Sequence, residues 1–101
     1  MAYQVVWSPK AIEDVEALAS YIANDSAAYS AAVVRKILDI TSKLNSFPLS
    51  GRIVPELGDP TLREKLAYSY RIIYKVEDET ITIAAVIHGK RLLESDKINE
   101  S

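Results

Sequence analysis

The chain has 101 residues, of which 49% are apolar and 26% are charged, and its formal net charge is −2. This length supports one hydrophobic core, and the composition is that of an ordinary globular domain, which excludes a disordered or fibrous chain. No cysteine is present, which excludes disulfide scaffolds, thiolate zinc sites and thiol nucleophiles, and no uncharged stretch approaches the roughly 20 residues that cross a bilayer. We therefore expect a cytoplasmic protein without a membrane partner, organised as a single domain over residues 1–93 with a short tail over residues 94–101.

A short strand and a helix are expected first. Bulky side chains recur at every second position of residues 3–7, which is the period of a strand. Ser8 and Pro9 then predict a helix start, because a serine oxygen can accept an orphan backbone N–H and proline suits the first helical position. Apolar residues recur at helical spacing as far as Ile22, and the helix is expected to end near Asn24.

A second amphipathic helix is expected next. Asp25 or Ser26 can cap its start, and Pro48 predicts its end by about Phe47. Along one stripe, apolar residues alternate steps of four and three: Val33, Ile37, Ile40, Leu44 and Phe47. Two such helices joined by a short connection should fold back on each other as an antiparallel pair.

The segment from Pro48 to Pro60, PLSGRIVPELGDP, holds three prolines and two glycines, which predicts a surface loop without regular structure. Loops of this length are uncommon in small domains unless they bind or cover something. Arg52 and Glu56 within it therefore have two readings, either a functional role or ordinary solvated charges.

Three extended segments complete the chain: 62–66, 70–76 and 80–87, the last two joined by a hairpin turn at VEDET. The expected fold is α+β, a small and mostly antiparallel sheet with an N-terminal helical hairpin packed on one face, in the order β-α-α-β-β-β.

The last strand is expected to end at the rim of a site. Its larger residues, such as Ile87, should face the helices, which places His88 on the helix-free face just before Gly89 allows a sharp turn. If the strands pair across the VEDET turn, Arg71 approaches His88.

Glu56, Arg71 and His88 together have a chemistry that fits RNA cleavage. The glutamate or histidine would move protons, the arginine would stabilise the charge of a phosphorane, and the 2′-hydroxyl of the RNA would be the nucleophile. The same side chains also make an ordinary anion-binding or partner-binding rim, in which Glu56 merely pairs with Arg52, Arg63 or Arg71. Only three glycines and one histidine are present, so we expect no phosphate-binding glycine loop, no multi-histidine metal site and no cofactor.

Cations gather in the last third of the chain. Residues 61–93 hold six Lys or Arg against four Asp or Glu, whereas residues 1–60 hold five against seven. Together with Arg52 of the loop, these residues supply candidates for contacts with a target or with phosphate: Arg63, Lys65, Lys90 and Arg91.

Three stretches in this order, WSPKAIEDVEALASYIA, FPLSGRIVPEL and LREKLAYSYRIIYKVEDETITIAAVIHGKR, resemble the RelE/ParE superfamily of type II toxin–antitoxin toxins. The resemblance covers residues 3–91 and implies a cognate antitoxin, bound in a hetero-oligomer, as partner. It also implies one of two targets, the ribosome with its mRNA in RelE-like ribonucleases or DNA gyrase in ParE-like toxins. Some ribonuclease members have a catalytic set of glutamate, arginine and histidine, and the resemblance implies that Glu56, Arg71 and His88 stand at the matching positions.

Three features favour the ParE-like branch. The ribonucleases tend to carry an aromatic residue where this chain has Gly89, and many are strongly basic, whereas this chain is acidic overall. The HGKR sequence is similar to the H-x-R-R ending of ParE-like toxins. Gyrase inhibition is therefore the preferred hypothesis, with a ribosome-dependent mRNA endoribonuclease and an inactive homologue that only binds antitoxin as alternatives.

Overall fold

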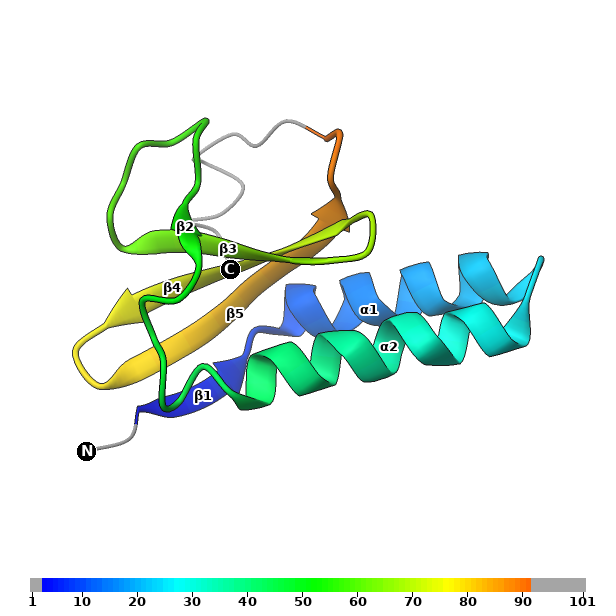
Figure 1. Cartoon of the computed structure of the whole chain (residues 1–101), viewed down its shortest axis with the longest axis horizontal. Coiled ribbons are helices and arrows are strands. Elements are labelled where there is room, and N and C mark those ends of the chain that lie inside the picture. The colour runs from blue at the N-terminus through cyan, green and yellow to red at the C-terminus, as the bar shows by residue number, and fades with distance from the viewer. Residues whose placement is uncertain (1–2, 92–101) are drawn as a thin grey trace.

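The structure is a computed structural model that describes residues 3–91, and the expected tail over residues 94–101 lies outside the described residues. Its elements follow the chain as β1 (Gln4–Trp7), α1 (Pro9–Ala23), α2 (Ala27–Ser42), β2 (Arg52–Ile53), β3 (Leu62–Ala67), β4 (Tyr70–Glu77) and β5 (Thr80–His88). The two helices lie side by side along one face of a twisted sheet (Figure 1). The predicted α+β fold is confirmed. No helix of residues 3–91 combines the length and the hydropathy needed to cross a membrane.

The sheet has five strands in the order β1-β5-β4-β3-β2. The pairs β4–β5 and β3–β4 are antiparallel, in line with the mostly antiparallel sheet that was expected. The pair β2–β3 is also antiparallel, whereas β1 pairs with β5 in parallel through Val5 and Ile81. The two-residue strand β2 lies inside the segment for which no regular structure was predicted. That prediction was wrong because Arg52 lies opposite Glu64 in this pairing, and the opposite charges stabilise the strand across the sheet edge.

Both helices begin at the predicted serines. The Ser8 oxygen accepts the Ala11 N–H at 3.0 Å, and the Ser26 oxygen accepts the Tyr29 N–H at 3.0 Å. The end of α2 was predicted too late, by about five residues, because the Lys43 N–H turns back to the carbonyl of Ile40 in a tighter turn.

Apolar side chains fill both faces of the sheet. On the helix side, residues of α1 and α2 pack on β4 and β5 in one cluster that includes Leu18, Val33, Ile37, Ile72 and Ile83. On the other face a second cluster forms where the loop after β2 folds over the sheet and packs residues of its own against the strands: Val54, Leu57, Leu62, Ile73, Ala85 and Ile87. The loop is visible in Figure 1 as the green arch over the sheet. The face without helices is therefore covered in part by this loop.

A β-bulge in β5 reverses which side chains face the helices. Ile73 pairs with Ala85, but the next residue, Tyr74, pairs with Ile83, so β5 carries one extra residue at this point. Beyond the bulge, Ala85 and Ile87 lie in the cluster away from the helices. The prediction that Ile87 faces the helices was wrong for this reason.

Candidate functional site

Arg71 lies at the centre of a group of ion pairs, called here the Arg71 network, with Glu56, Glu64 and Arg52. Arg71 is only 4% exposed, on β4. Its Nη1 and Nη2 donate to the two oxygens of Glu56 at 2.6 and 2.8 Å, and its Nε donates to Glu64 Oε1 at 2.8 Å. Nη2 also donates to Glu64, and Nη1 donates to the carbonyl oxygen of Arg91 at 3.0 Å.

These contacts occupy the whole guanidinium. An arginine has five N–H donors, and each of the five contacts of Arg71 uses one of them. The hydrogen bond to Glu56 and then the contacts with Glu64 raise the pKa of Arg71 above its ordinary value, against the opposing effect of burial. Arg71 is therefore permanently charged, and it has no donor left for a ligand.

Glu64, which the sequence reading missed, completes the network. Its side chain is 1% exposed, and its Oε2 accepts a hydrogen bond from Nε of Arg52 at 2.6 Å. Nη2 of Arg52 forms an ion pair with the same oxygen, also at 2.6 Å. Two carboxylates thus balance two guanidinium groups, and no buried side-chain nitrogen or oxygen within residues 3–91 lacks a hydrogen bond. One signal in the sequence was available, since Glu64 shares its strand face with Leu62 and Leu66 at two-residue spacing.

His88 lies on the other face of the sheet from the Arg71 guanidinium. It pairs with Tyr70, whose ring packs against the helix-side cluster and meets the imidazole edge to face at 5.8 Å. Arg71 pairs instead with Ile87, which points away from the helices. The expectation that Arg71 and His88 share the helix-free face was therefore wrong, and its cause is the β-bulge of β5.

A cavity of about 330 Å³ lies at the end of β5, and both His88 and the stem of Arg71 contribute to it. The His88 side chain is exposed, and its Nδ1 accepts the Lys90 N–H at 3.2 Å, which leaves Nε2 as the protonated nitrogen of the neutral ring. Arg52 and Lys90 also line this cavity. With two cations and an imidazole at its wall, the cavity has the chemistry of an anion site.

Gly89 closes this end of the sheet. Its N–H donates to the Ser69 carbonyl at 2.7 Å, and a Cβ added at this position would lie 3.0 Å from the same oxygen. The glycine thus permits the β3–β4 turn to approach the end of β5. This contact explains in packing terms why the strand stops after His88.

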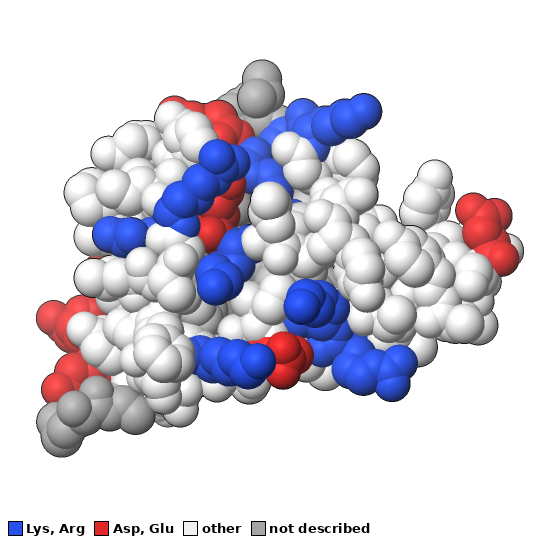
Figure 2. Space-filling model, in the orientation of Figure 1, with Lys and Arg blue, Asp and Glu red and all other residues white. Residues whose placement is uncertain are grey.

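The remaining predicted cations have different roles. Arg63 holds the loop, because its guanidinium donates to the carbonyls of Pro60 and Gly51 at 3.2 and 3.0 Å. Lys65 reaches Ser50 at 3.4 Å, while Lys90 and Arg91 lie exposed after β5. Figure 2 shows Lys and Arg side chains running across one face of the molecule, from the loop region down to α2.

Similarity to known proteins agrees with this fold. Residues 5–93 match the family model described as the ParE toxin of the type II toxin-antitoxin system, parDE. Among solved structures, the chain is similar to the chromosomal ParDE system of P. aeruginosa, with a TM-score of 0.70 and 18% identity over 86% of this chain and 96% of that chain. No curated protein matches the sequence.

Two further structures extend the likeness to the RelE side of the superfamily. A free E. coli RelE mutant has a TM-score of 0.62 and 20% identity over 99% of this chain and 93% of its own. The RelBE2 toxin-antitoxin complex of Mycobacterium tuberculosis has a TM-score of 0.58 and 24% identity, covering 87% and 99%. At such identities these likenesses establish the fold.

Proposed function

Because this chain belongs to the ParE toxin family of type II toxin–antitoxin systems, we propose that it arrests growth by binding DNA gyrase and is neutralised by a cognate antitoxin. Both steps are binding reactions in the cytoplasm and need no cofactor. The antitoxin holds the toxin in a hetero-oligomeric complex, in line with the toxin–antitoxin systems to which the fold is similar.

The occupied guanidinium of Arg71 carries the preference for binding over RNA cleavage. A ribonuclease built on Glu56, Arg71 and His88 needs an arginine that reaches the reacting phosphate and a base that reaches the attacking hydroxyl. Here every donor of Arg71 is used, Glu56 is clamped by two of them, and His88 lies on the opposite face. The three residues therefore act as two separate units, the ion pair of Arg71 with Glu56 and the side chain of His88. The ion pair has a structural role.

A second candidate function, ribosome-dependent mRNA cleavage, is favoured by the cavity at the end of β5. Its wall offers Arg52 and Lys90 for phosphate, the exposed ring of Tyr68 for base stacking, and His88 as the proton carrier. This version of the chemistry does not use Arg71. It makes His88 indispensable, which separates the two candidates.

Replacing His88 with Ala is expected to leave growth arrest unchanged within about twofold if gyrase is the target. The side chain is exposed, and its contacts are the Lys90 N–H and the edge of the Tyr70 ring, so the fold tolerates its loss. Growth would be measured after induction of the toxin gene alone, with Lys75→Ala, on the far part of β4, as the control. Complete loss of arrest with normal soluble yield favours the ribonuclease.

Two assays on the parent protein test the target directly. Purified toxin is expected to block supercoiling by gyrase in vitro and to leave translated messages without new primer-extension stops in cells. Normal supercoiling at excess toxin, together with new cuts in messages, overturns the gyrase proposal. Normal growth after induction without antitoxin indicates the inactive homologue instead.

A further inference from the structure

The β-bulge of β5 turns two consecutive carbonyls toward the same side. In a regular strand, successive carbonyls point to opposite edges and bond to the neighbouring strands. At the bulge the carbonyls of Ile83 and Ala84 both point toward the β1 side, where β1 ends at Trp7 opposite Ile83. The buried carbonyl of Ala84 therefore has no strand to bond with there, and it needs another partner.

Ser8 bonds to both of these carbonyls. Its N–H donates to the Ile83 carbonyl at 3.0 Å, and its hydroxyl donates to the Ala84 carbonyl at 3.1 Å. The same hydroxyl oxygen accepts the Ala11 N–H at the start of α1, and Ser8 is buried. A single serine thus caps α1 and also satisfies the extra carbonyl that the bulge creates.

Asp14, two turns further along α1, bonds to the other end of the bulge. Its Oδ2 accepts the N–H of the buried Val86 at 2.9 Å, and it also pairs with Lys10 at 2.9 Å. An unpaired N–H at this buried position would be costly. Side chains of the β1–α1 segment, Ser8 and Asp14, therefore do for this part of β5 what a neighbouring strand does elsewhere in the sheet.

The position of the bulge decides which side chains lie on each face at the end of β5. As the strand stands, Ile87 packs under the loop that carries Glu56, and His88 lies beside the Tyr70 ring. A slip of one residue would exchange the two faces. His88 would then lie on the face of the Arg71 guanidinium, and Ile87 would leave the loop.

We propose that Ser8 and Asp14 are positioning residues for the cavity at the end of β5. By bonding to the backbone on both sides of the bulge at Ala84, they fix the register of residues 84–88 and with it the face on which His88 lies. This inference goes beyond the proposed function, because it concerns how the cavity wall is built and holds for either target.

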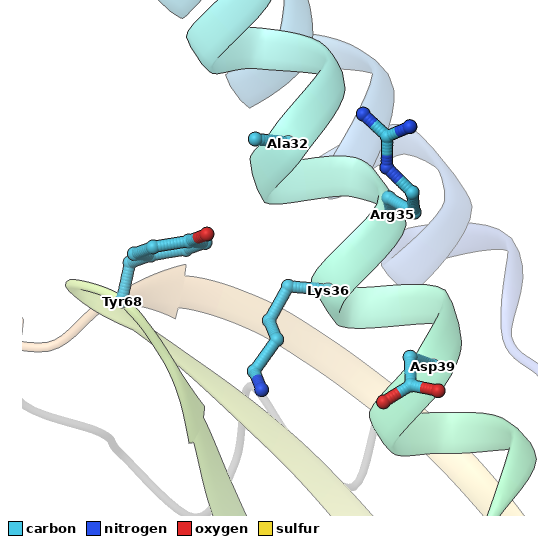
Figure 3. Close-up of a pocket in the computed structure, with 5 residues that line it drawn as sticks. All are labelled: Ala32, Arg35, Lys36, Asp39 and Tyr68. Atoms are coloured by element: carbon cyan, nitrogen blue, oxygen red, sulfur yellow. The ribbon is translucent and has the colours of Figure 1, made fainter.

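Two contacts on the β4 side offer a competing explanation of the register. The Gly89 N–H bonds to the Ser69 carbonyl, and Ile87 is buried under the loop. A slip of one residue would break both contacts. Tyr68, next to Ser69, contributes nothing to them, because its ring projects toward α2 in Figure 3 and meets Tyr29 edge to face at 5.7 Å. Variants that remove only the contacts from the β1–α1 segment separate the two explanations.

The first test compares two substitutions of Asp14. Asp14→Leu removes the acceptor of the Val86 N–H, whereas Asp14→Asn keeps a side-chain oxygen for it, and both lose the ion pair with Lys10. Amide hydrogen exchange of Val86 is expected to accelerate at least about tenfold in Asp14→Leu and to stay within about twofold of the parent in Asp14→Asn. Rescue by asparagine would show that the hydrogen bond, and not the charge, is the cause.

The second test measures the register itself. In the parent, nuclear Overhauser contacts across the hairpin are expected between Ile73 and Ala85. In Ser8→Ala combined with Asp14→Leu, the contact of Ile73 is expected to move to Ala84, the partner it would have in a strand without the bulge. If the double variant fails to fold, the exchange of the Val86 amide in Asp14→Leu decides the question.

The same spectra report the position of His88. Its contact with the Tyr70 ring is expected to disappear in the double variant, with Ile87 in its place opposite Tyr70. Ser26→Ala is the matched control for Ser8→Ala, because it also removes a helix cap but lies far from the bulge. The control is expected to keep every contact of the parent.

The inference and the proposed function fail separately. Unchanged exchange at Val86 in Asp14→Leu, together with an unchanged contact between His88 and Tyr70 in the double variant, would mean that Ile87 and Gly89 fix the register, and the inference would be overturned. Neither result depends on the target of the toxin. A parent protein that leaves gyrase active would overturn the proposed function and leave this assignment of Ser8 and Asp14 intact.

Discussion

Replacing Arg71 with Met is expected to lower the free energy of unfolding by about 3–5 kcal/mol, the cost of leaving a buried carboxylate without its partner. Glu64 is almost fully buried, and Arg52 alone would remain to neutralise it. Glu56 would lose its bidentate partner, and the loop that carries Glu56 would lose this ion pair to β4. Urea unfolding followed by circular dichroism measures the change.

A second substitution tests whether charge is the cause. In Arg71→Met combined with Glu64→Leu, no buried carboxylate is left at this point, so much of the lost stability is expected to return. Lys43→Ala is the control, because its side chain is 68% exposed, that of its partner Asp39 is 51% exposed, and such an exposed ion pair is worth about 1 kcal/mol or less. An Arg71→Met protein within about 1 kcal/mol of the parent would show that the network is dispensable.

Replacing Gly51 with Ala is expected to cost about 1–3 kcal/mol, the usual range for overpacking a core. The added Cβ would lie 2.5 Å from the backbone oxygen of Glu64 and 2.7 Å from the hydroxyl of Tyr74. Neither group can withdraw easily, since the first belongs to β3. The second is held by a hydrogen bond from its O–H to the Pro48 carbonyl at 2.9 Å.

The matched control for this prediction is Gly58→Ala in the same loop. No heavy atom lies within 4 Å of a Cβ at Gly58, so its cost comes from the positive φ of +63° alone, about 1 kcal/mol. Thermal unfolding of Gly51→Ala and Gly58→Ala shows which variant loses more stability, and so whether overpacking costs more than the positive φ. A larger loss at Gly58 than at Gly51 would contradict the predicted overpacking.

Local signals in the sequence predicted the helices and their starts well. Ser8 and Ser26 cap α1 and α2 because a serine before an amphipathic stretch has one favourable local role, which needs no distant partner. The β4–β5 hairpin followed from two-residue periodicity and the polar VEDET turn. These features depend on neighbours in the chain, so a reading of the chain alone finds them.

The candidate site was predicted less well because it depends on contacts between distant residues. The bulge at Ala84 and Ala85 is a backbone irregularity, and two adjacent alanines give no sequence pattern that would predict it. The bulge nevertheless moves His88 to the other face of the sheet. Glu64 was missed because a charged residue in a strand is ordinarily solvated, and its burial requires both Arg71 and Arg52. The residues were therefore identified more reliably than their arrangement.

The parallel pairing of β1 with β5 makes the assembly of this toxin a late event in translation. Val5 finds its partner Ile81 only after the ribosome has extruded more than seventy further residues. Until then α1 and α2 have no β5 to pack on, and truncated nascent chains lack the strand that joins both halves of the sheet. The folded toxin therefore forms only after nearly the whole domain, including β5, has been synthesised.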